Sequence, residues 1–179
     1  MEFWFWNWWA FSFLGYLLEK GYARATAAEK QNRKCFILLP LCPVYGFSVV
    51  LMLALPTVFR ESWPHLLIAS ALVPCVVEYL MHLYYEKCFG VCYWDYRDVP
   101  GNVGGRVCLP FALAWTALTP VAVRIIAPRL APVLTAIPWS ATYFAWMLLA
   151  ADWLLSRWVL LQYGDTERLT LQVLRRSAG

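Results

Sequence analysis

Long apolar segments follow one another along this chain and are separated by short polar connections. Five windows are mainly apolar, at about residues 3–19, 36–58, 65–85, 107–127 and 133–156. A helix needs about 20 such residues to cross the hydrocarbon core of a membrane. The pattern predicts an all-α membrane protein, in which residues 1–161 form a single transmembrane domain, a bundle of about five transmembrane helices.

The second window, residues 36–58, carries Pro40 and Pro43 near its start. Proline removes a backbone donor and can break a helix, so the entry into this span is expected to be irregular or re-entrant. Irregular backbone at that depth must face protein or a cavity.

Basic residues in the connections predict the orientation of the bundle. Twelve lie in the loop at 20–34, the loop at 87–106 and the C-terminal part from Arg157, whereas three lie on the opposite side, Arg60, Arg124 and Arg129. Lys and Arg accumulate in cytoplasmic loops. The N-terminus is therefore expected outside and the C-terminus in the cytoplasm, in a multi-pass protein of the cell membrane.

The tail at residues 162–179 has the pattern of a cytoplasmic amphipathic helix. Leu169, Val173 and Leu174 are set against basic residues such as Arg175. Such a helix is expected to lie on the anionic inner leaflet, which makes membrane lipid a partner.

Composition supports the membrane class, with 61% hydrophobic, 17% aromatic and only 15% charged residues. The net charge of +4 is small and lies mostly in short loops, so no nucleic acid is expected as a partner. The six cysteines are expected as free thiols on the reducing side. Indole rings favour the headgroup level of a bilayer. The tryptophans expected there are Trp4, Trp6, Trp8, Trp9, Trp63, Trp139, Trp153 and Trp158.

The third window places Glu78, His82 and Glu86 at i, i+4 and i+8, so these three side chains share one helix face. Glu78 lies roughly 12 Å deeper than Glu86, at ~1.5 Å rise per residue, and a carboxylate at that depth should face the bundle interior. Its candidate partners near the same end of the bundle are Glu19, Arg33, Lys34, Asp95 and Arg106. One interpretation is a buried Glu78–Arg106 salt bridge that only fixes helix packing.

The connection at residues 87–106 is rich in Gly, Tyr and Trp and is expected to be ordered. Trp94, Asp95 and Asn102, together with Arg106, supply an indole, an acid, an amide and a guanidinium. This set would suit an anionic headgroup or a nucleotide phosphate, gripped bidentately by Arg106.

No cofactor or metal is predicted. His82 could be a metal ligand, a proton relay or a packing histidine, but divalent sites usually draw their ligands from several elements. Asp152 in the fifth window is expected to be neutralised by Arg157, five residues on. The chain has no Walker motif, so it does not hydrolyse ATP by a P-loop mechanism.

Several short motifs together resemble one family. They are Gly15-Tyr16-Leu17-Leu18-Glu19, Pro40-Leu41-Cys42-Pro43-Val44-Tyr45-Gly46, Glu78-Tyr79, Trp94-Asp95-Tyr96, Asn102, Gly105-Arg106-Val107-Cys108-Leu109 and Trp115. In these the chain resembles the type IV ABC-transporter permease family, also called CmpB-like, a family of small multi-pass membrane proteins. His82, Cys88 and Cys92 are not part of that pattern.

The resemblance implies a membrane permease or substrate-binding subunit, with a polar pocket at the cytoplasmic end of the bundle for a small solute or lipid headgroup. Its partners would be energy-coupling or other membrane subunits, or further copies of the chain. The residues expected to bind the ligand or line its pathway are Glu19, Pro43, Tyr45, Glu78, His82, Glu86, Trp94, Asp95, Asn102 and Arg106.

Two other functions remain open from the sequence. An intramembrane enzyme acting on a lipid or polyprenyl phosphate would use Glu78 or Asp95 as a general base, with Arg106 and Asn102 on the phosphate. A structural or assembly protein would use the same polar cluster only to fix its fold or dock a partner.

Overall fold

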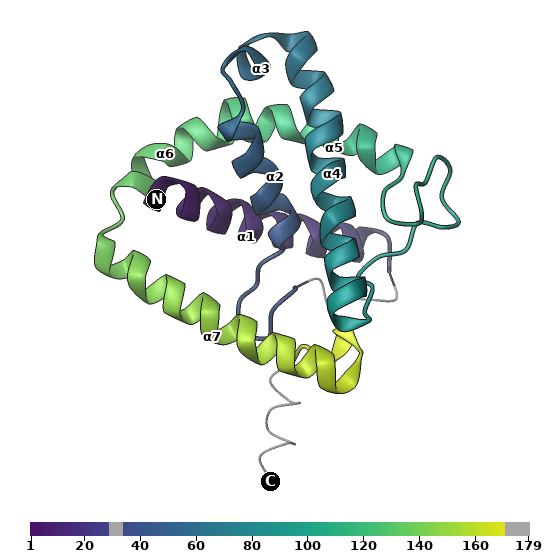
Figure 1. Ribbon diagram of the computed structural model, residues 1–179. Coiled ribbons are helices and arrows are strands. Elements are labelled where there is room, and N and C mark those ends of the chain that lie inside the picture. Colours follow the sequence, from purple (N-terminus) through teal and green to yellow (C-terminus); the bar gives the residue numbers. More distant parts are fainter. Residues whose placement is uncertain (29–33, 171–179) are drawn as a thin grey trace.

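The computed structural model describes residues 1–28 and 34–170, and the regular elements in these ranges are all helices. A π-helical segment, Ala122–Ile126, joins two of the helices end to end, and a short 3-10 turn, Thr166–Arg168, follows the last one. The α-helices, labelled in Figure 1, are α1 (Glu2–Ala25), α2 (Pro43–Ala54), α3 (Val58–Glu61), α4 (Trp63–Phe89), α5 (Leu109–Val121), α6 (Ala127–Thr135) and α7 (Trp139–Tyr163).

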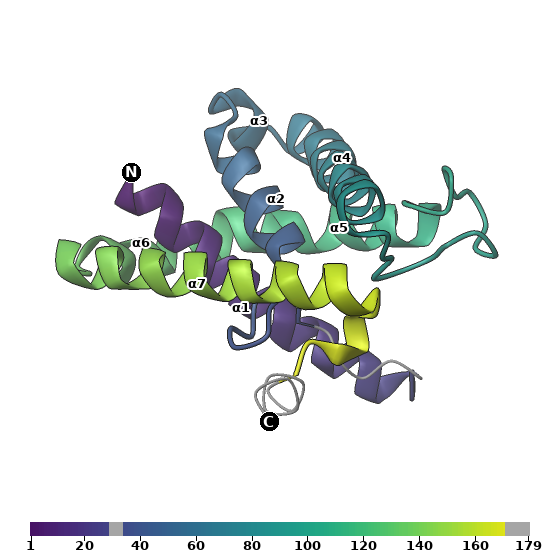
Figure 2. The same cartoon turned by 60° about the horizontal axis from the view of Figure 1, so that its bottom comes forward.

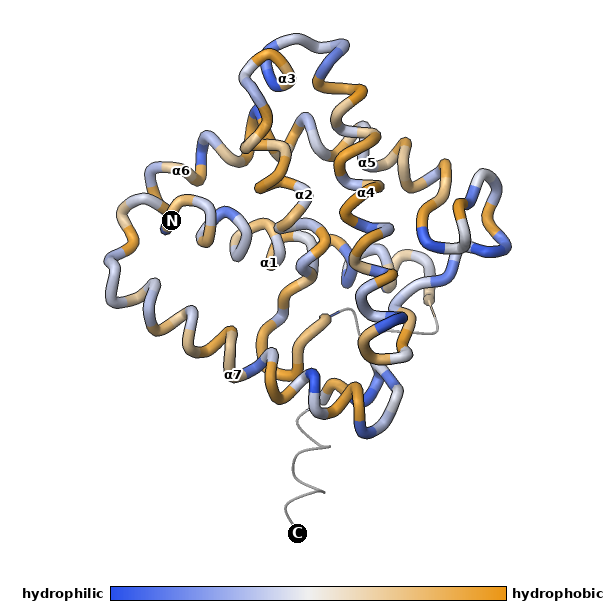
Figure 3. Tube along the Cα trace, viewed as in Figure 1, coloured by the Kyte–Doolittle hydropathy of each residue, from blue (hydrophilic) through white to orange (hydrophobic). Residues whose placement is uncertain are grey.

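Three helices in the described residues are long and apolar enough to cross a membrane: α4, the continuous helix Leu109–Thr135, and α7. Their outward faces are strongly apolar. On α4, for example, Ile68, Leu72, Val76 and Leu80 recur every four residues and all stand exposed. An exposed apolar stripe of this length is typical of a surface in contact with lipid. Figure 3 shows that hydrophobic residues dominate α2, α4 and α5 and that strongly hydrophilic residues gather in the connection between α4 and α5.

The second apolar window is helical only over α2, which has 12 residues. Residues 36–42 before it form no helix, and Pro43 occupies the first helical position, where its missing N–H costs nothing. The irregular entry expected from Pro40 and Pro43 is therefore present in the structure.

The helix of the fourth window extends beyond the end of the apolar window. It continues through three prolines, none of which ends it. Pro120 lies inside α5, Pro128 lies in the first turn of α6, and Pro132 lies inside α6. The π-helical segment Ala122–Ile126 begins two residues after Pro120. Proline removes one helical hydrogen bond and displaces the preceding turn, and a π-bulge is one way for a helix to continue past such a defect.

Close packing of α1 on α2 depends on two glycines. A Cβ on Gly15 would lie 2.2 Å from Cγ of Tyr45, and a Cβ on Gly46 would lie 2.4 Å from the carbonyl oxygen of Trp8. Each glycine therefore lets the backbone of one helix approach a residue of the other. This packing places the end of α1 next to the start of α2.

The irregular segment before α2, residues 35–42, is buried except at Leu38 and Pro40, and it reaches across to α7, as Figure 1 shows. The fully buried Asp152 carboxylate accepts hydrogen bonds from the backbone N–H groups of Ile37, Leu38 and Leu39. The predicted neutralisation of Asp152 by Arg157 is wrong, because the Arg157 guanidinium lies over the ring of Trp153, 6.0 Å from its centroid. Asp152 instead accepts hydrogen bonds from the backbone of segment 35–42, which is distant in the sequence.

The described part of the tail is not a continuous helix. The last long helix, α7, ends at Tyr163, where Gly164 adopts a left-handed conformation with φ of 61°. The 3-10 turn Thr166–Arg168 follows, and Leu169 is fully buried. The predicted positions Val173 and Leu174 lie outside the described residues, as do Arg175 and Arg176.

Candidate functional site

A cavity of about 650 Å³ lies between the C-terminal end of α1, the start of α2, the second half of α4, the start of α5 and the connection that follows α4. Glu19 and Glu78 contribute the charged groups of its wall. Aromatic side chains make up much of the remainder, among them Tyr45, Trp94 and Trp115. The cavity joins polar groups to an otherwise apolar surface, as is usual for small-molecule sites.

Glu78 is 5% exposed and faces the bundle interior, as its depth in the third window predicts. One carboxylate oxygen accepts a 3.0 Å hydrogen bond from the hydroxyl of Tyr96, and the other accepts a 3.2 Å hydrogen bond from the indole N–H of Trp115. Among the described residues it forms no ion pair. The interpretation of a Glu78–Arg106 salt bridge is therefore wrong.

Glu19 is brought to the cavity by the packing of α1 on α2. Its carboxylate accepts a 2.7 Å hydrogen bond from the hydroxyl of Tyr45. The ring of Tyr45 lies 4.8 Å from that of Trp115, centroid to centroid, and Trp115 in turn donates to Glu78. A chain of contacts thus links the two carboxylates through two aromatic side chains.

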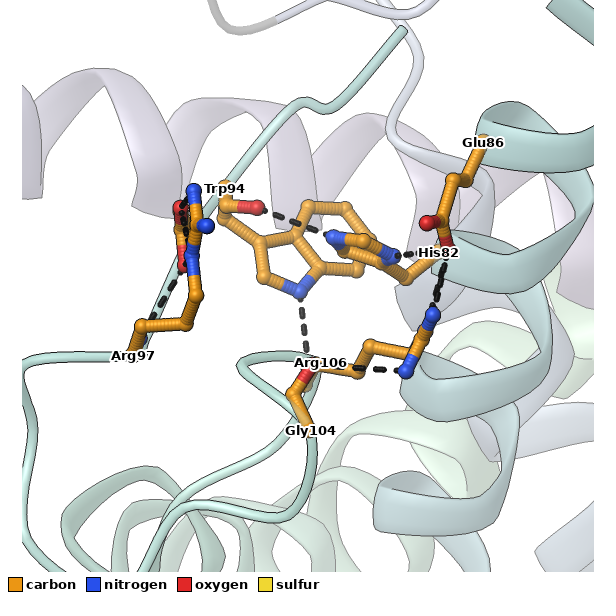
Figure 4. A network of polar contacts seen from close by, with 7 residues as sticks. His82, Glu86, Trp94, Arg97, Gly104 and Arg106 are labelled. Carbon is orange, nitrogen blue, oxygen red and sulfur yellow. Dashed lines mark hydrogen bonds and ion pairs between the residues drawn. The ribbon is translucent and has the colours of Figure 1, made fainter. Parts of the chain in front are cut away.

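Arg106 pairs with Glu86 near the end of α4, with 2.5 Å between Nη2 and Oε2, as drawn in Figure 4. A second hydrogen bond from its Nε to the same oxygen is 3.2 Å long. The hydrogen bonds to Glu86 raise the pKa of Arg106 above its ordinary value. The guanidinium also lies over Tyr79, 5.4 Å from the ring centroid. Neither Arg106 nor Glu86 lines the cavity.

His82 is buried and attaches the connection to α4. Its Nε2 lies 3.1 Å from the carbonyl oxygen of Trp94, and since a carbonyl only accepts, this nitrogen carries the proton. Trp94 then donates its indole N–H to the carbonyl of Arg106 at 2.8 Å, which closes the network of Figure 4. Within the described residues no group of three His, Cys, Asp or Glu side chains is placed to hold a metal ion. These contacts place His82 between α4 and the connection that follows it.

Asp95 and Asn102 form hydrogen bonds within the connection that follows α4. The exposed Asp95 carboxylate binds the guanidinium of Arg97, and these hydrogen bonds lower the pKa of Asp95. The side-chain amide of Asn102 donates to the carbonyls of Arg97 and Val99, while its oxygen accepts from the N–H of Gly105. The connection has the ordered structure that its composition predicts.

Of the ten residues proposed from the sequence, four line the cavity: Glu19, Tyr45, Glu78 and Trp94. His82 and Glu86 on α4 form the adjoining network with Arg106 of the connection, and Asp95 and Asn102 stabilise the connection. Pro43 begins α2 and lines a separate, mainly apolar cavity of about 440 Å³. The motif residues Tyr96 and Trp115, which hold Glu78, were not selected from the sequence, although both stand in the motifs quoted above.

The sequence also gave no signal for Tyr22, Tyr93 and Phe111, which line the cavity as well. Each comes from a different part of the chain, the first from α1, the second from the connection and the third from α5. No local spacing relates them, so only the fold brings them together.

Residues 6–156 match the family described as "Putative ABC-transporter type IV". The chain belongs to this family. The match covers most of the chain and includes all of the residues named above for the cavity, so the cavity is part of the family region. No curated protein and no solved structure matches the chain. The family match and the three apolar helices together identify the protein as an ABC-transporter-related membrane protein.

Proposed function

We propose that this protein is a membrane permease or substrate-binding subunit that holds a small solute or a lipid headgroup in the cavity between α1, α2, α4 and α5. The observation that supports this most directly is the position of Glu78. It is a buried carboxylate whose described partners are two neutral donors, in the wall of a cavity of about 650 Å³. Ligand sites commonly measure about 300–1,000 Å³.

We propose further that α1 and the segment from residue 35 to the end of α2 complete a bundle of five membrane-spanning segments. The first helix has 24 residues, so at ~1.5 Å per residue it is about 36 Å long and sufficient for a bilayer core of about 30 Å. In the irregular segment 35–42, Asp152 accepts hydrogen bonds from the N–H groups of residues 37–39, and such satisfaction of backbone donors is the condition for irregular backbone at membrane depth.

The orientation proposed is N-terminus outside and C-terminus in the cytoplasm of a multi-pass protein in the cell membrane. In Figures 1 and 2 the ends of α1, α4 and α7 and the start of α5 lie toward one side of the molecule, away from the N-terminus and the α6–α7 turn. The connections at those ends carry most of the Lys and Arg residues. The cavity would then open near the cytoplasmic surface.

Transport energy would come from another subunit, because this chain contains no P-loop. The enzyme interpretation has less support, since the groups assigned to a phosphate are already engaged. Arg106 is paired with Glu86, and Asn102 is occupied by backbone groups of its own connection.

The test is native mass spectrometry of the protein purified in mild detergent, comparing wild type with Glu78→Gln and with Glu61→Gln. The second substitution removes the same charge from α3, where it is exposed and far from the cavity. A small molecule or lipid retained by wild type and Glu61→Gln, and lost from Glu78→Gln, is expected. Identical spectra and equal thermal stability for all three would indicate a structural or assembly protein instead.

A further inference from the structure

The lining of the cavity also restricts the chemistry of its ligand. On the basis of the function proposed above, we infer that the ligand is a small organic cation, an amine or quaternary ammonium group carried on an apolar body, held by Glu78 and by the surrounding aromatic rings.

The first argument is the aromatic lining. Tyr22, Tyr45, Tyr96, Phe111 and Trp115 all contribute to the cavity wall. The rings of Tyr96 and Phe111 are stacked with centroids 5.0 Å apart, and Tyr22 meets Phe111 edge-on at 6.0 Å. Aromatic rings attract cations through their quadrupoles, and sites that bind quaternary ammonium groups commonly combine several such rings.

The second argument is the charge in the cavity wall. Glu78 lines it with two neutral hydrogen-bond donors as its described partners, and the lining residues that the structure describes include no Lys, Arg or His. Glu78 lies deep in the bundle, where the electric field of a charge is poorly screened. An ammonium group on the ligand would neutralise Glu78 while leaving its hydrogen bonds from Tyr96 and Trp115 intact.

The same features disfavour an anion. Arg106, the guanidinium that the sequence assigned to a phosphate, is paired with Glu86 and does not line the cavity. Arg97 is paired with Asp95 on the surface of the connection. An anion beside Glu78 would meet like charge in a poorly solvated place.

The experiment is isothermal titration calorimetry on the full chain in nanodiscs of phosphatidylglycerol, a lipid without an ammonium group. The probes are choline and benzyltrimethylammonium, together with 3,3-dimethylbutanol and 3,3-dimethylbutyrate. These last two match the shape of choline closely but are neutral and anionic. We expect the cations to bind at least ten times more tightly than the neutral and anionic probes. Glu78→Gln should weaken cation binding at least tenfold, and Glu61→Gln should leave it unchanged.

A second variant keeps the test independent of the folding of the Glu78 variant. Tyr22 is 47% exposed, so Tyr22→Leu removes one ring of the wall with little risk to the fold. It should weaken cation binding about threefold and leave the binding of 3,3-dimethylbutanol unchanged. Repeating the titration in nanodiscs of phosphatidylcholine, whose headgroup carries a quaternary ammonium, distinguishes a lipid headgroup from a free amine as the ligand. Competition by the lipid indicates a headgroup, and unchanged binding indicates a free amine.

Equal or tighter binding of the neutral or anionic probe would overturn the inference, and so would the absence of binding by either cation. The proposed function is judged separately by mass spectrometry. A ligand that depends on Glu78 but is not a cation would leave that function standing, whereas no Glu78-dependent ligand at all would remove both.

Discussion

The carboxylate of Asp152 on α7 accepts a 2.6 Å hydrogen bond from the backbone N–H of Leu39, which lies 113 positions earlier in the chain. The same side chain serves the N–H groups of Ile37 and Leu38, while Ser156 offers a further acceptor to Ile37 at 3.0 Å. Backbone donors that are buried without a partner cost about 1–3 kcal/mol each. Asp152 therefore allows a segment without secondary structure to be buried beside the cavity.

Asp152→Asn is expected to destabilise the protein by about 2–4 kcal/mol, because an amide offers one acceptor oxygen and places an NH₂ against the remaining donors. Thermal unfolding in detergent, followed by circular dichroism, measures this. Asp98→Asn makes the same chemical change at an exposed position and should have no effect. Equal melting temperatures for Asp152→Asn and wild type would show that segment 35–42 does not depend on α7.

Gly46→Ala is expected to destabilise the protein by about 1–3 kcal/mol, because the added methyl meets backbone of α1 at Trp8, which cannot rotate away. The control is Gly21→Ala on α1, where a Cβ meets nothing within 4 Å. That substitution should be neutral or stabilising, since alanine favours helix over glycine by about 1 kcal/mol. The comparison fails if the two variants melt alike.

Arg106→Ala is expected to loosen the connection after α4 without loss of the ligand. The substitution removes the ion pair with Glu86 and the contact with Tyr79, so trypsin should cleave after Arg97 several times faster than in wild type. Native mass spectrometry of the same variant should still show the ligand retained, because Arg106 does not line the cavity. Loss of the ligand with unchanged cleavage would favour the phosphate site instead.

The orientation of the protein is tested with a membrane-impermeant maleimide. Cys88 and Cys92 are exposed in the structure and stand on the side that the basic residues assign to the cytoplasm. They should react in inverted vesicles and not in intact cells. A variant with both changed to Ser and Glu61 changed to Cys should give the opposite result. Labelling of Cys92 from outside intact cells would invert the topology.

The sequence was sufficient to predict the features that depend on whether a segment is surrounded by lipid, by water or by protein. Burying Glu78 against lipid is costly, so its inward direction follows from its depth alone. The irregular backbone before α2 follows from Pro40 and Pro43 because proline cannot supply the missing donors. The family motifs also identified the chain, and the match over residues 6–156 confirms that resemblance.

The partners of the charged residues did not follow from the sequence. Arg106 is on a connection whose path is set by glycine turns, and it pairs with Glu86, the more exposed of two carboxylates on the same face of α4. An ion pair with the more exposed carboxylate, Glu86, loses less hydration than a pair with Glu78 would, so it costs less free energy to form. For Asp152 helix geometry does exclude the predicted partner, because residues five apart point roughly 140° away from each other at about 3.6 residues per turn.

The sequence by itself determined the all-helical class, the three long apolar helices and the inward direction of Glu78, because these depend on how much of each segment can be dissolved in lipid. Only the tertiary structure decided which side chains share the cavity. Glu19, Tyr93 and Trp115 lie far apart in the chain and meet because glycines bring α1 onto α2 and hydrogen bonds attach the connection to α4. Such contacts depend on how the helices pack in three dimensions. The order of residues along the chain does not give the distance between side chains that lie on different helices.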